Sequence, residues 1–457
     1  MSGKMTVGWW LRYCVLLLVS LAGGCSALDP KPTPPPASAD ARNIAVFFDG
    51  TANDLGSGTN TSDLYQLVLA QGHIGTFYIE GVGAKGKPVG LAMAWGIGQR
   101  VRLAYAYLAE HYREGDQVYL FGFSRGADSA RILASLLYHA GLPGRPLPSA
   151  TPDALAELVF DAYKCGTYER NAVCASHEWG SAKRIERVNA ALAIRHVDPM
   201  KPVPVRFLGL WDTVEALGWP DYEENVDVPN HRYADQLCNV EQAAHALSLD
   251  DNRARIFTPI LLTRVHLLSD CGRGDTRDIS DTRVRAQIKA EVSAKVEEIY
   301  FAGAHADVGG GYEGQQGRLS GVSLNWMIRK AIEAGLPLRA DSHASLPRPE
   351  DPLADGNDAE GEFPNFLMYK RMYRNIDAYA EHDESVTPVV KFHHSLRKRL
   401  AQRPRSGAEY GGPDPVYQQR LRALVKDGRF ESCFPANGDG LRPLSEVTCR
   451  NLIISNP

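Results

Sequence analysis

The sequence has no excess of positive charge. Its 457 residues carry 50 lysines and arginines against 54 aspartates and glutamates, which gives a formal net charge of −4 and a pI near 6.4. Lysine and arginine form no basic stripe along the chain, so nucleic acid is not expected as a partner. The rest of the composition, 44% hydrophobic and 23% charged, is that of an ordinary globular protein with enough apolar residues for a sizeable core.

The sequence also lacks the spacings of a metal site and of a nucleotide site. None of its eight cysteines forms a C-x-x-C pair, so no metal is predicted. The segment from Gly81 to Gly86 fits G-x-G-x-x-G, but Pro88 and Gly90 follow where a dinucleotide site needs a helix. Pro88 also replaces the Ser or Thr of a P-loop. The segment is therefore interpreted as a flexible loop, and no cofactor is predicted.

The apolar run near the N-terminus, Cys14 to Ala22, is too short to span a bilayer comfortably. Lys4 and Arg12 precede it, which is typical of a signal peptide. The run leads into Leu21-Ala22-Gly23-Gly24-Cys25, which resembles a bacterial lipobox. Residues 1–24 are therefore predicted to be removed and Cys25 to be lipidated, with ordinary signal-peptidase cleavage as the alternative.

The residues after Cys25 bear on the compartment. Ser26 follows the cysteine, and by resemblance to lipoprotein sorting signals this favours the outer membrane of a bacterial cell envelope. Residues 25–42 are rich in proline and predict an extended tether. The protein is thus expected to meet the membrane through an N-terminal lipid anchor; its oligomeric state is left open.

The remaining cysteines agree with an oxidising compartment. Removing Cys14 with the signal peptide and assigning Cys25 to the lipid leaves six of the eight, an even number. Fifteen pairings are possible. Pairing between neighbours in sequence is our prediction, and six buried free thiols are the alternative. The predicted pairs are Cys165 with Cys174, Cys238 with Cys271, and Cys433 with Cys449.

The stretch from Val118 to Arg131 contains G-x-S-x-G, with Ser124 at its centre. An apolar strand precedes this motif and a segment with helical spacing follows it, which is the context of a nucleophile elbow. At such a turn the serine hydroxyl projects from the backbone, and only small residues fit two positions before and after it. The motif alone occurs by chance in chains this rich in glycine, so a structural turn is the alternative.

Four apolar strands end in side chains that can do chemistry. The strands are predicted at 44–48, 118–123, 205–211 and 298–302, and the second strand is preceded by a helix at 99–111. Strand–helix–strand order indicates a parallel sheet, and open parallel sheets build their sites at the carboxyl ends of the strands. The side chains that follow these strands are Asp49, Ser124, Asp212 and His305.

Ser124, Asp212 and His305 occur in the order of an α/β-hydrolase triad. In that triad a neutral histidine takes the serine proton, and a carboxylate orients the histidine. The alternatives are that Asp212 caps a turn and that His394, which also follows an apolar run, is the base. Asp49 and Asp307 are interpreted as turn anchors. The predicted oxyanion donors are the backbone N–H of Arg125 and one from Gly50 or Thr51.

Five motifs in this order resemble the α/β-hydrolase domain of type VI secretion phospholipase effectors and their uncharacterised relatives. They are Phe47-Phe48-Asp49-Gly50-Thr51, Gly122-Phe123-Ser124-Arg125-Gly126-Ala127, Gly209-Leu210-Trp211-Asp212-Thr213-Val214, the segment 245–253, and the segment 303–311. The resemblance runs from about Ile44 to Met327, and the predicted triad residues fall on the triad positions of that family. The block Asp250-Asp251-Asn252-Arg253 departs from the Asp-Glu-Arg-Arg-like block of the family, which leaves its role open.

The resemblance implies an α/β fold with a mostly parallel sheet, helices on both faces, and a lipid as the ester substrate. The hydrolase domain is expected at 43–338, with an insertion at about 143–202 and a C-terminal region at 339–457; either addition could form a lid. A lipidated export signal is unexpected for an injected effector and favours a resident envelope enzyme. An esterase or thioesterase for small soluble esters, and a non-catalytic binding lipoprotein, are the alternatives.

Overall fold

The structure is a computed structural model. It describes residues 28–37, 41–84, 92–143, 150–166, 179–214, 233–253, 257–271, 277–339 and 349–357, and in addition 359, 374, 376, 379, 382–386, 390–401 and 452–454. The predicted leader, Cys25, and the cysteines at 433 and 449 lie outside these residues, so the predictions about them are not tested. None of the described helices is both long and apolar enough to cross a membrane.

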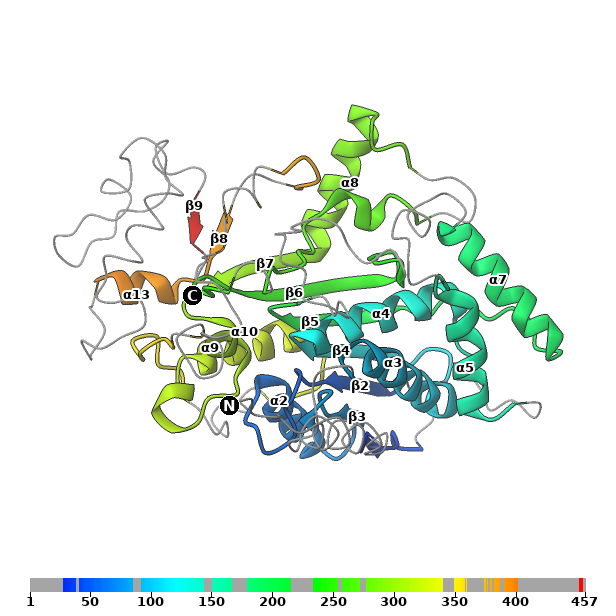
Figure 1. Ribbon diagram of the computed structural model, residues 1–457, viewed down its shortest axis with the longest axis horizontal. Coiled ribbons are helices and arrows are strands. Elements are labelled where there is room, and N and C mark those ends of the chain that lie inside the picture. The colour runs from blue at the N-terminus through cyan, green and yellow to red at the C-terminus, as the bar shows by residue number, and fades with distance from the viewer. Residues whose placement is uncertain are drawn as a thin grey trace, which may run out of the picture.

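A single mostly parallel sheet forms the centre of the molecule (Figure 1). Its strand order is β1-β3-β2-β4-β5-β6-β7-β8-β9, and β1 is antiparallel to β3 while the other neighbours run parallel. The strands are β1 (Lys31–Thr33), β2 (Asn43–Phe48), β3 (Gly75–Ile79), β4 (Gln117–Phe123), β5 (Val205–Trp211), β6 (Val240–Ser248), β7 (Val296–Phe301), β8 (Val390–Phe392) and β9 (Leu452–Ile454). The predicted α/β class with a mostly parallel sheet is confirmed.

Helices pack on both faces of this sheet. They are α2 (Asn60–Leu69), α3 (Ala92–His111), α4 (Arg125–Ala140), α5 (Pro152–Tyr163), α7 (Ser181–Ile194), α8 (Thr282–Lys295), α9 (His305–Gly309), α10 (Ser320–Glu333) and α13 (Ser395–Ala401), with 3-10 turns η4 (Val265–Leu268) and η5 (Gly314–Gly317). Alternate residues of β2 enter different cores: Ile44 and Val46 join the core under α3, α4 and α5, and Ala45 and Phe47 join the one under α2 and α10. Side chains of successive strand residues point to opposite faces, so both faces of β2 are buried.

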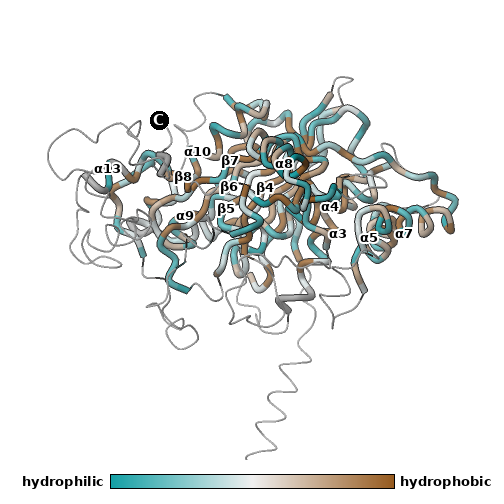
Figure 2. Tube along the Cα trace, turned by 90° about the horizontal axis from the view of Figure 1, so that it is seen from above, coloured by the Kyte–Doolittle hydropathy of each residue, from teal (hydrophilic) through white to brown (hydrophobic). Residues whose placement is uncertain are grey.

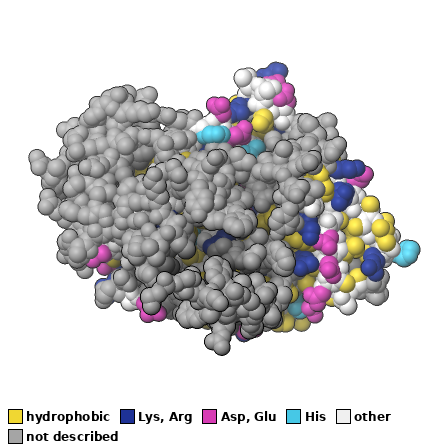
Figure 3. All heavy atoms as spheres, viewed as in Figure 1, with side chains coloured by type: hydrophobic (Ala, Val, Ile, Leu, Met, Phe, Trp, Pro, Cys, Tyr) yellow, Lys and Arg dark blue, Asp and Glu magenta, His cyan; other side chains and the backbone are white. Residues whose placement is uncertain are grey.

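In its described part, the stretch predicted as an insertion contains α5 and α7, which extend one end of the molecule (Figure 1). α5 packs on α3, and α7 packs on α5. Apolar and polar residues mix along both helices (Figure 2), and α5 buries one face through Leu155, Val159 and Phe160. The described surface over this end carries interspersed charges of both signs (Figure 3).

Two of the predicted domain boundaries do not coincide with the ends of the sheet. Part of the proline-rich tether is bound to the domain, because Lys31–Thr33 forms the edge strand β1 and the Tyr107 hydroxyl donates to the carbonyl of Thr33 at 2.8 Å. At the other edge, β8 and β9 come from beyond residue 338, so the sheet continues into the region that was assigned to a separate C-terminal part. A lid role for that region stays a prediction.

Cys238 and Cys271 form a disulfide, as predicted. The bond joins Cys238, two residues before β6, to the segment that follows η4, with a sequence separation of 33 residues. Cys165 is disulfide-bonded as well. Its predicted partner, Cys174, lies outside the described residues, so that pairing stays a prediction.

Candidate active site

Ser124 lies at the tight turn between β4 and α4, with φ of 58° and ψ of −126°. A positive φ is uncommon for a residue with a Cβ atom and marks a strained turn. The two glycines of the motif are required sterically. A Cβ atom at Gly122 would stand 2.4 Å from the carbonyl oxygen of Gly126, and one at Gly126 would stand 2.2 Å from the carbonyl oxygen of Phe48. The local geometry is therefore that of the predicted elbow.

Asp212 follows β5, the strand next to β4, and is fully buried. Its Oδ1 accepts hydrogen bonds from Ser248 N at 2.9 Å and Arg374 Nη1 at 2.7 Å, and its Oδ2 accepts from Arg374 Nη2 at 2.8 Å. Burial by itself would raise the pKa of Asp212, but the Arg374 charge and the hydrogen bonds from His305 and Arg374 hold it well below its usual range. The carboxylate is thus ionised.

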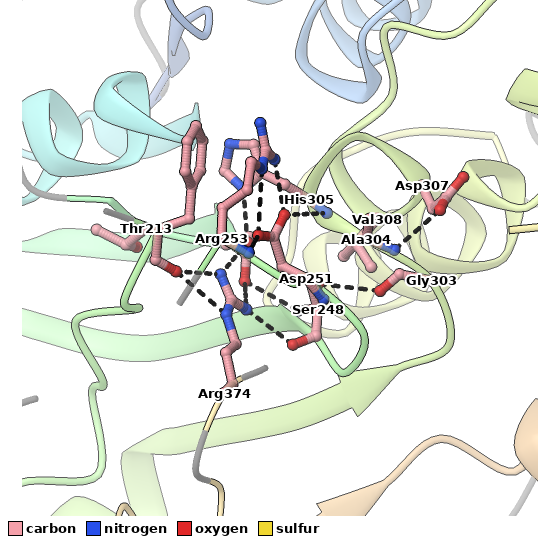
Figure 4. Close-up of polar contacts among 12 residues, drawn as sticks. Thr213, Ser248, Asp251, Arg253, Gly303, Ala304, His305, Asp307, Val308 and Arg374 are labelled. Carbon is pink, nitrogen blue, oxygen red and sulfur yellow. Dashed lines mark hydrogen bonds and ion pairs between the residues drawn. The ribbon is translucent and has the colours of Figure 1, made fainter. Parts of the chain in front are cut away.

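His305 is the first residue of α9, directly after β7 and a three-residue turn. Its Nδ1 lies 2.5 Å from Asp212 Oδ2. Its ring packs against Phe123, with centroids 4.7 Å apart, and against Phe257 at 4.9 Å. Burial lowers the pKa of His305, partly offset by Asp212, so the neutral imidazole is favoured. The contacts around His305 hold it in one orientation (Figure 4), and its neutral form can accept a proton.

The block after β6, whose role the sequence left open, anchors the loop that carries His305. Asp250 accepts a hydrogen bond from Gly303 N at 2.7 Å, and Asp251 accepts one from His305 N at 3.1 Å. Arg253 pairs with Asp251 at 2.7 Å, and its guanidinium stacks 3.6 Å over the Phe257 ring. The block therefore holds the backbone of the histidine, while Asp212 holds its ring.

Ser124 is next to this pair without a direct hydrogen bond to it. Its backbone N donates to the Trp211 carbonyl at 2.9 Å, and its carbonyl accepts from Val214 N at 3.4 Å, so the elbow and the Asp212 turn are bonded on both sides of the aspartate. Phe123, the residue before it, is the one that packs on His305. No hydrogen bond joins the Ser124 hydroxyl to His305 within the described part of the chain. Such contacts are often long before substrate binds.

The predicted oxyanion donors lie around the same edge of the sheet. Arg125 is the first residue of α4, where backbone N–H groups point out of the helix. The N–H of Gly50 already donates to Asp49 Oδ1 at 2.7 Å, which favours Thr51 as the donor from the first-strand loop. Arg100, fully buried on α3, fixes this loop by donating to the Asp49 carbonyl at 2.6 Å.

The loop that begins at Gly81 and resembles a dinucleotide motif packs against the loop after β2, which carries the predicted oxyanion donors Gly50 and Thr51. Gly81 N donates to the Asn53 carbonyl at 2.8 Å, and Ala52 N donates to the Val82 carbonyl at 2.9 Å. A Cβ atom at Gly81 would stand 1.7 Å from the carbonyl oxygen of Gly50. The first glycine is thus explained by close backbone contact.

Asp49 and Asp307 are turn anchors, as interpreted from the sequence. Asp49 accepts from Thr59 Oγ1 at 2.8 Å and from the Tyr78 hydroxyl at 2.6 Å, and burial raises its pKa to about 6. Asp307 accepts from Ala304 N and from Asn357, and burial raises its pKa to about 7. Neither carboxylate is paired with the His305 ring.

Two sets of residues near the site were missed from the sequence. Arg374 binds the carboxylate of Asp212 from the C-terminal region, and no local pattern marks it. His245 on β6 lies behind the Asp212 turn: its Nε2 accepts from Thr213 N at 3.1 Å, and its Nδ1 lies 2.8 Å from Glu298. His245 lies on β6 and Glu298 on β7, and a polar residue inside an otherwise apolar strand is the sequence signal that could have indicated them. Within the described residues no group of three or more metal-binding side chains converges.

Comparison with known proteins gives a family. A family model described as "T6SS, Phospholipase effector Tle1-like, catalytic domain" matches residues 42–330. Among curated proteins, an uncharacterised protein of Saccharomyces cerevisiae, YEL023C, is 25% identical over 267 residues, which are 52% of this chain and 35% of the yeast protein. The chain thus spans about a third of that relative.

Solved structures that match this chain include an uncharacterised protein from Pseudomonas aeruginosa, at 18% identity and a TM-score of 0.36, covering 66% of this chain and 47% of the other. An esterase from Thermogutta terrifontis has 14% identity and a TM-score of 0.32, covering 68% and 88%. The Tle1 effector bound to the VgrG spike has 15% identity and a TM-score of 0.29, covering 64% and 59%.

Proposed function

Because the chain belongs to the family of type VI secretion phospholipase effector Tle1-like catalytic domains, with a match over residues 42–330, we propose that it is a serine hydrolase that cleaves carboxylic ester bonds of lipids. The observation that carries the proposal is the buried pair of Asp212 and His305 at 2.5 Å, placed beside the Ser124 elbow. A serine hydrolase of the triad type needs this arrangement, whereas a binding protein has no need of all three side chains.

The chemistry divides into two steps. Ser124 Oγ attacks the ester carbonyl carbon while its proton passes to Nε2 of His305, and Asp212 stabilises the imidazolium through Nδ1. The oxyanion is bound by the N–H groups of Arg125 and Thr51. As the C–O bond breaks, the alcohol leaves with the proton from His305. A water molecule then gives a proton to His305 as its oxygen attacks the acyl carbon. The bond between that carbon and Ser124 Oγ breaks, the proton passes from His305 to Oγ, and the acid leaves.

The lipid as substrate is inferred from the family, since triad residues are indifferent to the acyl donor. Incubation with a fluorophosphonate probe should label Ser124 of the wild-type protein. A panel of phospholipids, neutral lipids, short soluble esters and thioesters then separates the alternatives. Faster turnover of long-chain lipids supports the proposal. Faster turnover of soluble esters or thioesters would indicate an esterase or thioesterase instead. If the protein shows no labelling and no turnover, the alternative of a non-catalytic binding protein is favoured.

The lipid anchor gives a separate prediction. We propose that Cys25 is lipidated in a bacterial envelope. Intact-mass analysis of membrane-extracted protein should give a chain that lacks residues 1–24 and carries a diacylglycerol group on Cys25. Cys25→Ser should release the protein from membranes. A mature chain of the same mass, apart from the substitution, in wild type and variant would contradict the prediction.

A further inference from the structure

Arg374 binds both carboxylate oxygens of Asp212 in a buried ion pair. Its Nη1 donates to Oδ1 at 2.7 Å and its Nη2 to Oδ2 at 2.8 Å, and both side chains are 0% exposed. The same guanidinium donates to the carbonyls of Ser248 at 2.7 Å and Phe257 at 2.6 Å. Two parallel bonds from a planar guanidinium fix the rotation of a carboxylate as well as its position.

We propose that Arg374 is a positioning residue for the proposed hydrolase: it fixes the carboxylate of Asp212 so that Oδ2 meets Nδ1 of His305 and the ring stays aligned with Ser124. The inference rests on the proposed function. Arg374 lies beyond residue 330, where the family match ends. The C-terminal region therefore contributes a side chain to the site.

The hydrogen bonds at Asp212 support this role. Oδ1 is held by Arg374 and Ser248 N, and Oδ2 by Arg374 and His305. Without the guanidinium, Asp212 would keep one backbone donor and the histidine, and its carboxylate could turn about the Cβ–Cγ bond. Asp212 also has φ of 41°, a backbone conformation that few side chains adopt, so its local structure depends on these contacts.

The charges around His305 support it independently. Two buried carboxylates bond the histidine and each is paired with an arginine, so the two ion pairs add no net charge around a neutral imidazole. Asp250 and Asp307 bind backbone and amide groups of their own loops. The charged groups nearest the histidine are Asp212 after β5, which bonds its ring and pairs with Arg374, and Asp251 after β6, which bonds its backbone N and pairs with Arg253. Removing Arg374 leaves a net negative charge, which favours the protonated imidazole.

The experiment compares pH profiles of kcat/KM. His305 accepts a proton only when neutral, so activity falls as the pH drops through its pKa, and this forms the acid limb of the profile. In Arg374→Met the limb should move to higher pH by about one unit, because a nearby positive charge has been removed. Arg374→Lys keeps the charge but loses the two parallel bonds. Its limb should stay near that of the wild type, while kcat falls at least about tenfold with little change in KM.

Arg184→Met is the matched control. Arg184 is equally buried and donates to the carbonyls of Trp179 and Tyr163, far from the site, so its loss should lower thermal stability without moving the acid limb. The same result in Arg374→Met, lower stability with an unmoved limb, would make Arg374 merely structural and overturn the inference. If Arg374→Met does not fold, Arg374→Lys decides alone, and a wild-type kcat would overturn it. An active Ser124→Ala, measured in parallel, would instead refute the proposed function.

Discussion

Ser124→Ala should lower the turnover of ester substrates at least about a thousandfold, because the attacking oxygen is lost and only binding and oxyanion stabilisation remain. It should also abolish labelling by a fluorophosphonate. The fold should be kept, since alanine is as small as serine and the hydroxyl of Ser124 makes no hydrogen bond to His305 in the structure. The measurement is kcat/KM with circular dichroism on the same preparation.

Ser129 gives a matched control within the same helix. It is fully buried on α4, and its hydroxyl donates to the Arg125 carbonyl at 2.9 Å, so Ser129→Ala should stay within about tenfold of wild type. Ser124→Gly should be as inactive as Ser124→Ala yet more stable than it by about 1 kcal/mol, because glycine adopts φ of 58° without strain. Activity of Ser124→Ala within about tenfold of wild type would mean that the elbow is not the catalytic site.

Much of this site could be predicted because its residues follow apolar strands. The strands before Ser124, Asp212 and His305 are marked by runs of buried residues, and parallel strands bring their carboxyl ends to one edge of a sheet. The register of a parallel sheet then determines which turns lie side by side. Knowledge of three strand ends was thus sufficient to place three side chains near one another.

The contacts that hold these side chains could not be predicted in the same way. Arg374 is 162 residues from Asp212 in sequence, and nothing in its local pattern distinguishes a buried arginine from a surface one. The Gly50 N–H donates to the carboxylate of Asp49, and this bond depends on a turn conformation that the neighbouring residues do not determine. The edge strands β1 and β9, and β8 next to β9, are three residues each, too short for a periodicity to show.

His305→Ala should lower turnover as much as Ser124→Ala, because serine without a base is a weak nucleophile. The double variant Ser124→Ala/His305→Ala should be no worse than either single variant, since the members of a triad act as a unit. The fold should survive the loss of the ring: Asp212 keeps its bonds to Arg374 and to Ser248 N, and Asp251 still accepts from the backbone N of residue 305.

His394→Ala distinguishes the two candidate bases. His394 follows β8, and its ring packs on His393, which stacks on Phe301. The carboxylate of Asp212 is bonded to the other candidate base, His305. His394→Ala should therefore keep most of the activity. An inactive His394→Ala beside an active His305→Ala would mean that the base is misassigned even though the elbow is right. Additive losses in the double variant of Ser124 and His305 would mean that the two side chains act in separate steps, because independent contributions multiply in kcat/KM whereas those of a coupled pair do not.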